Sequence, residues 1–521
     1  MEINTRILAG RYYDSVALMA ATNRLKENPK VSDAVLIMGT EVNKELLAQG
    51  GLLTPEAQQA CANDLIICVK CASGAAALLD EAEALLSNRT ASFRQSSELP
   101  PSIRSALRNH PDLNLVLISL GGSYASREAR EALAAGMHVL LFSDNVALED
   151  EIALKRYAVS HGLLLMGPGA GTALINGVGL GFANAVEKGE IGIVSAAGTG
   201  LQEVSTLISK NGAGVSQGIG TGGRDLSQPV GGLTFFQGLQ ALLADENTRV
   251  LVLISKPPDA QVTQQLLQTL GDPPKPVVLC LLGAKLPESS ARNLHFARTL
   301  EECALTAVGL WKGSAVNMSA VLQEEEQHWQ PVVEELRAKL DGCQRFLRAL
   351  FSGGTLCYEA QSIWKELLSS PVYSNAPLSK ENKLPDSNRS QGHSAHSAID
   401  LGEEEFTRGR PHPMIDNSLR IQRLRQEAFD PHTAVIVLDV VLGYGAHADP
   451  AGELGTAIEQ ISSELRQNER TVVFIASVTG TQADPQNLQQ STQKLADSGV
   501  LVCSSNAQAA RLAARFVEGR R

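Results

Sequence analysis

The stretch Ile191-Gly-Ile-Val-Ser-Ala-Ala-Gly-Thr-Gly-Leu-Gln-Glu203 decides the fold of this chain. It begins with apolar, β-branched residues typical of a buried strand, and residues 197–200 are small, as in a tight turn. From Leu201 onward the apolar residues recur at helical spacing, and Gly212 can end the helix. Such a turn leaves backbone N–H groups at the positive end of a helix, where a phosphate or carboxylate can bind. Close packing would also explain the small residues, so this stretch alone leaves both interpretations open.

A second stretch repeats the pattern and strengthens the anion-binding interpretation. It reads Arg348-Ala-Leu-Phe-Ser-Gly-Gly-Thr-Leu-Cys-Tyr-Glu359. In both stretches Gly-Thr closes the turn, and a glutamate lies five residues after that glycine. A very apolar strand follows each unit, at 250–254 and at 435–438. The repeat predicts two similar domains that present two helix N-termini to one ligand.

Composition limits the classes of protein and partner. A length of 521 residues predicts about three or four domains. The net charge of −11 argues against a nucleic-acid or anionic-membrane partner, and no apolar run is long enough to span a membrane. The first residues do not resemble a secretory signal. The eight cysteines are dilute, and because we expect reduced thiols, we expect a cytoplasmic protein.

The candidate metal ligands do not form a complete set. Cys68 and Cys71 have CxxC spacing without a second pair, so we expect reduced core thiols. His447 and Asp449 lack a third ligand, and no metal site is predicted.

Strands alternate with helices along the chain, which predicts an α/β protein with parallel sheets covered on both faces. We expect domains at 1–186, 187–320 and 344–521, with a helical connector at 321–343 and a flexible loop at 369–397.

Candidate site residues lie in glycine-rich and proline-rich loops. Arg224, in Ile219-Gly-Thr-Gly-Gly-Arg-Asp225, can clamp an anion with its planar guanidinium or merely pair with Asp225. His412, in Gly409-Arg-Pro-His-Pro-Met-Ile-Asp416, is expected on an ordered loop rather than in a core, because two prolines and polar residues surround it. The predicted phosphate or substrate contacts are Ala197, Gly198, Thr199, Gly200, Gly222, Gly223, Lys256, Ser352, Gly353, Gly354, Thr355, Gly443 and Gly445.

Several of these motifs resemble a known group of enzymes. Met166-Gly-Pro168, the stretch 191–203 and Gly220-Thr-Gly-Gly223 resemble the α subunit of succinyl-CoA synthetase. Residues 350–359 with 435–445 resemble the carboxy-terminal domain of that enzyme's β subunit. The fused order is closer still to the FdrA family of acyl-CoA-synthetase-like proteins, through residues 142–146, 221–227, 255–258 and 409–416. The resemblance implies a CoA-binding-type Rossmann domain followed by two flavodoxin-like domains.

The sequence also departs from the synthetases. Ala9-Gly-Arg-Tyr-Tyr-Asp-Ser15 has one glycine where the synthetases have a glycine-rich CoA loop, so CoA is possible but no cofactor is required. His295, in Arg292-Asn-Leu-His-Phe-Ala297, lacks the glycines of a phosphohistidine loop. It is a weak phosphohistidine candidate, with a surface or packing histidine as the alternative. No ATP-grasp half is evident.

The resemblance to the FdrA family implies a function in ureide, or allantoin, nitrogen catabolism. Some members act as part of an oxamate carbamoyltransferase, so carbamoyl phosphate and oxamate or a related acid are the expected ligands. Arg224 and Lys256 would then supply positive charge. His412 would be a candidate proton shuttle, with the alternative that it only fixes its loop through Asp416. The alternatives are a CoA-ligase subunit with an ATP-grasp partner and a non-catalytic anion- or nucleotide-binding regulator. In each case we expect a hetero-complex, a homo-oligomer, or both.

Overall fold

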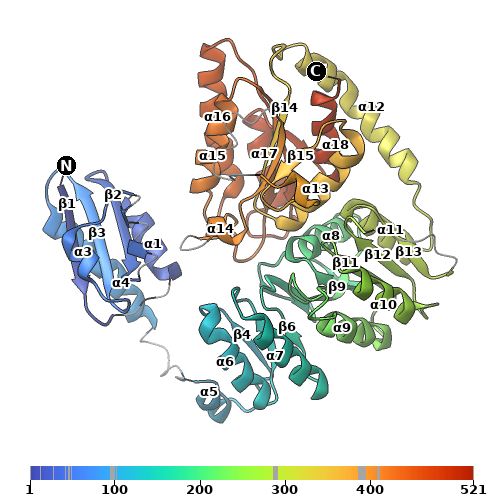
Figure 1. Ribbon diagram of the computed structural model, residues 1–521, viewed down its shortest axis with the longest axis horizontal. Coiled ribbons are helices and arrows are strands. Elements are labelled where there is room, and N and C mark those ends of the chain that lie inside the picture. The colour runs from blue at the N-terminus through green and yellow to red at the C-terminus, as the bar shows by residue number, and fades with distance from the viewer. Residues whose placement is uncertain are drawn as a thin grey trace. The chain divides into compact units, whose positions relative to one another are not determined.

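The computed structural model describes residues 2–11, 13, 15–26, 28–40, 43–44, 47–48, 50–93, 100, 102–284, 291–384, 395–407 and 411–519 (Figure 1). These residues form two compact units, one ending at Pro111 and the other covering 112–407 and 411–519. Each unit is described by itself. Gly409 of the proline-rich motif and part of the predicted loop 369–397 lie outside the described residues.

The first unit contains a three-stranded antiparallel sheet in the order β1-β3-β2, formed by Glu2–Leu8, Leu65–Cys71 and Val31–Met38. Alternate residues of β3 enter two different cores, as the two-residue period of a strand requires. One core contains α1 (Ser15–Lys26) and α4 (Ala75–Phe93), and the other contains α3 (Pro55–Gln59). The helix α5 (Ile103–Asn109) follows.

This antiparallel pairing corrects the parallel sheet predicted for the whole of 1–186. The second unit opens with a small parallel sheet, β4-β5-β6, at Leu115–Ile118, His138–Leu141 and Leu165–Met166. Its helices are α6 (Gly122–Ala134) and α7 (Leu148–Ser160). The Rossmann-like strand–helix alternation is therefore found in the later part of that segment.

A seven-stranded sheet follows, in the order β13-β12-β11-β9-β10-β7-β8. Strands β9 to β13 are parallel, and β7 and β8 form an antiparallel edge. The bounds are β7 Thr172–Ile175, β8 Val178–Gly181, β9 Lys188–Ala196, β10 Val215–Gly220, β11 Val250–Ser255, β12 Val277–Leu281 and β13 Leu294–Phe296. Its helices are α8 Gly198–Lys210, α9 Leu233–Ala244, α10 Ala260–Leu270 and α11 Leu300–Lys312.

The last sheet is parallel, in the order β15-β16-β14-β17-β18-β19, and α12 (Met318–Arg337) precedes it. The strands are β14 Phe346–Phe351, β15 Val372–Ser374, β16 His396–Asp400, β17 Thr433–Val441, β18 Val473–Thr479 and β19 Leu501–Cys503. The helices are α13 Gly354–Leu367, η1 Lys380–Asn382, α14 Glu404–Thr407, α15 Ser418–Phe429, α16 Pro450–Gln467, α17 Leu488–Asp497 and α18 Asn506–Val517. The predicted loop 369–397 therefore contains β15, η1 and the start of β16.

One hydrophobic core joins the two larger sheets. It contains buried residues of α8 and α11 together with buried residues of α13 and α18, which lie close together in Figure 1. The α/β class and the parallel sheets are thus confirmed. In the described part of the chain, no helix combines the length and the apolar character that crossing a bilayer requires.

Candidate functional site

The turn between β9 and α8 presents an open helix N-terminus. The Ser195 hydroxyl holds this turn, because it donates to the Ala197 carbonyl at 2.7 Å and accepts from the Ala197 N–H at 3.2 Å. Among the described residues no side chain caps α8, so the N–H groups of Gly198, Thr199 and Gly200 have no side-chain acceptor there. These groups, at the positive end of the helix dipole, can bind an anion.

The matching turn before α13 already holds a carboxylate of the protein. Asp439 accepts hydrogen bonds from the N–H groups of Ser352 and Gly353, both at 2.8 Å, and from the Ser352 hydroxyl at 3.0 Å. Arg420 donates to Asp439 at 2.5 Å and fixes it in place. The α13 turn therefore has fewer N–H groups for an external anion than the α8 turn.

The two turns are in direct contact. The N–H of Thr355 donates to the Thr199 hydroxyl at 3.3 Å. A Cβ on Gly353 would lie only 2.8 Å from the Thr199 methyl carbon, and a Cβ on Gly200 only 3.0 Å from that of Thr355. The glycines of the repeat therefore allow the two helix N-termini to meet, as the repeat predicts.

Two buried hydroxyl groups at this junction have no hydrogen-bond partner in the described structure. They belong to Thr355 in the α13 turn and to Thr172 at the start of β7. The Thr172 oxygen lies 3.8 Å from the position that a Cβ on Gly198 would occupy. A buried unsatisfied hydroxyl costs about 1–3 kcal/mol, so a bound water or ligand oxygen would stabilise both groups.

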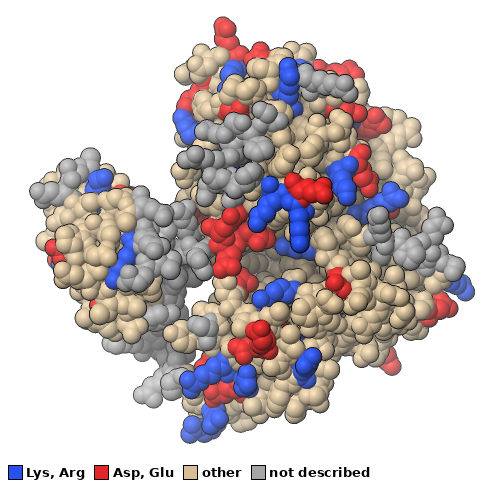
Figure 2. Space-filling view, viewed as in Figure 1, with Lys and Arg blue, Asp and Glu red and all other residues tan. Residues whose placement is uncertain are grey.

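Charged side chains converge above Gly354. A Cβ on this glycine would collide with Oδ2 of Asp400, which ends β16, and would lie 2.7 Å from Nζ of Lys256, which follows β11. Burial raises the pKa of Asp400 to about 7, and the Lys256 ammonium opposes that shift. Figure 2 shows a hollow in this view of the protein with acidic side chains to its left and basic side chains above and below it.

His412 lies on the same side of the α13 turn. Its Nδ1 accepts from the Met414 N–H at 3.2 Å, so the proton of the neutral ring belongs on Nε2. Nε2 lies 2.9 Å from the position of a Cβ on Gly402, which Asp400 also approaches. Burial lowers the pKa of His412 to about 4, so the ring is neutral at pH 7. The loop is held by the Asp416 N–H, which donates to the His412 carbonyl at 3.1 Å, rather than through the Asp416 side chain.

Arg224 does not pair with Asp225. It contacts the buried Glu151 carboxylate at 2.8 Å and donates to the Val146 carbonyl at 2.8 Å. The carboxylate of Asp225 instead binds Lys155 at 2.6 Å. The predicted alternative for Arg224 therefore named the wrong partner. Its side chain remains 47% exposed.

The Asp144 carboxyl lies within the electrostatic influence of both Arg224 and Lys256. Burial raises the pKa of the Asp144 carboxyl, while the charges of Arg224 and Lys256 lower it and that of Glu403 raises it. The charges of Lys256 and Glu403 also act on Asp400. Asp144 and Asp400 therefore experience the same two charges, from different sheets.

Three other predicted glycines, Gly222, Gly443 and Gly445, lie against or hydrogen-bond to other parts of the protein. Gly222 has a φ of +90°, and a Cβ there would collide with the Pro168 carbonyl, whereas a Cβ on Gly223 would meet nothing within 4 Å. The N–H of Gly443 donates to Gln486 at 3.0 Å, and a Cβ on Gly445 would lie 3.1 Å from Phe182.

His295 lies in strand β13, paired with Val278, and not in a loop like that of a phosphohistidine. Burial lowers its pKa. Strand β13 is an edge strand of the seven-stranded sheet, whereas α8 follows the central strand β9. No contact places His295 at the junction of α8 and α13 in the described structure.

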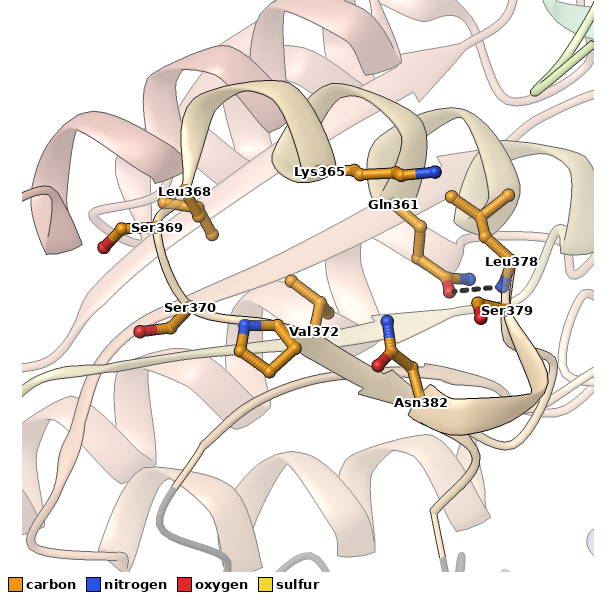
Figure 3. Close-up of a pocket in the computed structure, with 10 residues that line it drawn as sticks. Gln361, Lys365, Leu368, Ser369, Ser370, Val372, Leu378, Ser379 and Asn382 are labelled. Atoms are coloured by element: carbon orange, nitrogen blue, oxygen red, sulfur yellow. Dashed lines mark hydrogen bonds between the residues drawn. The ribbon is translucent and has the colours of Figure 1, made fainter.

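A separate pocket of about 300 Å³ borders the C-terminal half of α13 (Figure 3). The Gln361 side chain closes one wall by accepting from the Leu378 N–H at 3.3 Å. The lining also includes Lys365 and the edge strand residue Val372. Because the candidate site is at the opposite end of the same helix, this pocket is separate from it.

Sequence comparison decides the family. The chain is 43% identical over 522 residues to the uncharacterized protein YahF of Escherichia coli K12, covering 99% of both chains. Residues 350–516 match a family described as CoA-ligase, and residues 1–101 match "AllF, heavy metal-associated domain". The chain belongs to the FdrA family of acyl-CoA-synthetase-like proteins.

More distant relatives agree with a CoA-ligase-like protein. This FdrA-family chain is 27% identical over 232 residues to the α subunit of ADP-forming succinate–CoA ligase from Methanothermobacter thermautotrophicus, covering 44% of the chain and 76% of the relative. It also resembles the dinucleotide-forming acetyl-coenzyme A synthetase 1 of Ca. Korarchaeum cryptofilum, at 13% identity and a TM-score of 0.31, covering 81% of the chain and 86% of that structure.

The family that matches residues 1–101 is described as heavy metal-associated, but Cys68 and Cys71 are not placed to bind a metal ion together. Cys68 belongs to the core that contains α3, whereas Cys71 belongs to the core that contains α1 and α4. The two thiols therefore lie on opposite faces of the sheet and cannot bind one ion together. In the described part of the chain, no cluster of three or more metal-binding side chains occurs.

Three acidic residues of the site were not among the sequence candidates. Asp400 and Asp439 lie at or near the ends of parallel strands, and Asp144 follows β5 closely. An acidic residue near the carboxyl end of an apolar strand was the available signal, since ligands of open α/β sheets bind at that edge.

Proposed function

We propose that the chain is the FdrA-type subunit of a carbamoyl-transferring enzyme of ureide nitrogen catabolism. The enzyme would move a carbamoyl group between phosphate and a small amide acid such as oxamate. The observation that carries this proposal is the contact between two helix N-termini, of which α8 has open N–H groups. Phosphate is the anion that such a site suits best.

The charges around the turns suit both ends of the substrate. Lys256 and the α8 turn would bind phosphate and the oxygen of the carbamoyl group, where negative charge develops during transfer. Asp400 and Asp144 would accept hydrogen bonds from the N–H groups of a carbamoyl or oxamate group. Arg224 would add positive charge from farther away, because it already pairs with Glu151.

The transfer needs positioning more than covalent catalysis. A phosphate oxygen attacks the carbamoyl carbon of an N-carbamoyl acid, the carbon–nitrogen bond breaks, and carbamoyl phosphate and the amide acid leave. The leaving nitrogen gains one proton, and phosphate loses one. Holding both reactants in one site lowers the barrier by removing the entropy cost of their encounter. His412, neutral beside Gly402, was the sequence candidate for the proton shuttle.

The second candidate function is a CoA-ligase-like subunit that works with an ATP-grasp partner. The CoA-ligase match and the β4–α6 turn favour it, because α6 begins after Gly121 with no side-chain cap. Residues 9–15 stand where the synthetases have their CoA loop, but they contain one glycine and follow a strand of the antiparallel sheet. If CoA binds, its phosphate groups would contact the turn around Gly121 and Gly122.

Either function would be performed in a complex with other subunits, in the cytoplasm. The dilute cysteines of the sequence, without the regular spacing of a disulfide framework, are typical of that compartment.

Calorimetric titration of the purified chain tests the proposal. Binding of phosphate, or of carbamoyl phosphate with oxamate, without binding of CoA is the expected result. An assay of carbamoyl phosphate formation from N-carbamoyl oxamate and phosphate, with co-purifying subunits present, checks the activity. Tight binding of CoA without carbamoyl exchange would replace the first function with the second.

A further inference from the structure

The hydroxyl group of Thr172 is buried beside the open N-terminus of α8. Thr172 is 1% exposed, and its side-chain oxygen has no hydrogen-bond partner among the described residues. This oxygen lies 3.8 Å from the position that a Cβ on Gly198, the first residue of α8, would occupy. An unsatisfied buried hydroxyl next to N–H groups without a side-chain acceptor indicates a ligand that accepts hydrogen bonds from both.

The space beside Gly198 is open. Apart from the helix itself and the chain neighbours of Gly198, no other described atom lies within 4 Å of that Cβ position, and 3.8 Å is an ordinary van der Waals distance. Gly198 and Thr199 are also partly exposed, so a small ligand can approach this turn from solvent. The matching position on α13 is filled, because a Cβ on Gly354 would collide with Asp400. The α8 turn therefore has room for an external anion that the α13 turn lacks.

The backbone holds Thr172 in place without using its hydroxyl. Thr172 begins β7 and pairs with Gly181 of β8, and a Cβ on Gly220 of β10 would collide with the Thr172 carbonyl. The preceding turn is fixed by the Gly171 carbonyl, which accepts from the Phe182 N–H at 2.7 Å. The hydroxyl is therefore not needed to hold the strand, and burying it without a partner lowers the stability of the free protein.

We propose that Thr172 is a phosphate-binding residue, whose hydroxyl donates to an oxygen of a phosphate held by the N–H groups of the α8 turn. The inference rests on the proposed function, in which phosphate is a reactant. The N–H groups and the hydroxyl can all donate, and the ionised oxygens of phosphate accept. Contacts to two of its oxygens fix the orientation of the phosphate, which positions the oxygen that attacks the carbamoyl carbon.

Two substitutions separate this role from a structural one. Thr172→Val keeps the shape of the side chain and removes the hydroxyl, whereas Thr172→Ser keeps the hydroxyl. The full-length chain, with the subunits that co-purify with it, is titrated with inorganic phosphate by calorimetry. Phosphate affinity should fall at least about tenfold in the valine variant, because it loses a hydrogen bond to a charged group, and should stay within about threefold of wild type in the serine variant.

Stability gives a second readout that a structural role would not share. Without phosphate, the urea unfolding midpoint of Thr172→Val should equal or exceed that of the wild type, because the substitution removes an unsatisfied buried hydroxyl. Thr433→Val is the matched control. Thr433 also begins a strand, β17, and its buried hydroxyl also lacks a partner in the described structure. It lies at the end of β17 away from Asp439, which bonds to the α13 turn, so this control should keep wild-type phosphate affinity.

The outcomes separate the role of Thr172 from the proposed function. Wild-type phosphate affinity in Thr172→Val overturns the role and leaves the carbamoyl transfer standing. A lower unfolding midpoint in this variant also overturns it, because the hydroxyl would then bond within the protein. Equal losses of affinity in the valine and serine variants would assign the effect to packing and contradict the role. A wild type, complete with its subunits, that neither binds phosphate nor forms carbamoyl phosphate overturns the function itself.

Discussion

Glu203 and Glu359 both accept hydrogen bonds from Asn506, the first residue of α18. Glu203 accepts from its backbone N–H at 3.0 Å, and Glu359 accepts from its side-chain amide at 2.7 Å. Glu359 also accepts from the N–H of Leu300 at 2.6 Å, at the start of α11. Each glutamate of the repeat therefore reaches the N-terminus of a helix that follows the opposite sheet. This exchange holds the α8 and α13 turns together.

Replacing Asn506 with alanine should destabilise the second unit by about 2 kcal/mol. The Asn506 side-chain amide donates to the buried Glu359 carboxyl and to the Leu356 carbonyl, and alanine removes both hydrogen bonds. The unfolding midpoint in urea measures this loss. Asn468→Ala is the control. The Asn468 side chain donates an exposed hydrogen bond to the Glu464 carbonyl, and the loss of this bond should cost less than about 0.5 kcal/mol. Equal losses in the two variants would mean that Asn506 does not join the two halves.

The contact between the two turns should be necessary for phosphate binding. A Cβ on Gly353 would lie 2.8–3.0 Å from three side-chain atoms of Thr199, so Gly353→Ala should push the helix N-termini apart. We expect at least a tenfold weaker phosphate affinity by calorimetry, or ~1.4 kcal/mol. Gly342→Ala, where a Cβ would meet nothing within 4 Å, is the matched control and should bind normally. Unchanged affinity in Gly353→Ala would place the phosphate elsewhere.

Local patterns were sufficient to predict the strand–turn–helix units at 191–203 and 348–359. Periodicity and small residues specify such a unit within a dozen positions. The contacts that complete the site come from distant residues. Asp439, which caps the α13 turn, lies 87 positions from Ser352, and nothing in its local sequence announces that contact.

Two predictions from the sequence, the parallel sheet of the first unit and the loop at 369–397, were wrong for the same physical reason. The local sequence of a strand does not encode which strand it pairs with or in which direction. The strand Leu65–Cys71 reads the same whether its neighbours run parallel or antiparallel, so the sheet of the first unit was predicted wrongly. Val372–Ser374 lies in a polar, proline-containing stretch and becomes a strand by pairing with β16. In both cases the partner strand decides the structure.

Lys256 and Arg224 should contribute unequally to anion binding. Lys256→Met should weaken phosphate binding about tenfold, because its ammonium lies beside Gly354. Arg224→Ala should weaken it less than about threefold, since the guanidinium is already paired with the buried Glu151. Titration with phosphate at constant ionic strength measures both. Lys339→Met, which removes an exposed lysine paired with Glu335, controls for net charge. A larger effect of Arg224→Ala would make Arg224 the main anion contact.

His396 should make the protein less stable in acid. Burial and the nearby charge of Arg348 lower its pKa to about 4, and its Nδ1 accepts from the Leu347 N–H at 3.1 Å. An unfolded histidine has a pKa of about 6.5. Between these values the unfolded chain binds more protons than the folded chain, so stability falls as the pH drops from about 6.5 to 4. This group alone should contribute a loss of up to about 1.4 kcal/mol per pH unit.

Urea unfolding of wild type and His396→Asn at pH 4.5 and 7 measures the difference. The variant should show a smaller loss, while His328→Asn, at an exposed position, should behave like the wild type. An undiminished loss in His396→Asn would assign the acid sensitivity to other groups, His412 first among them.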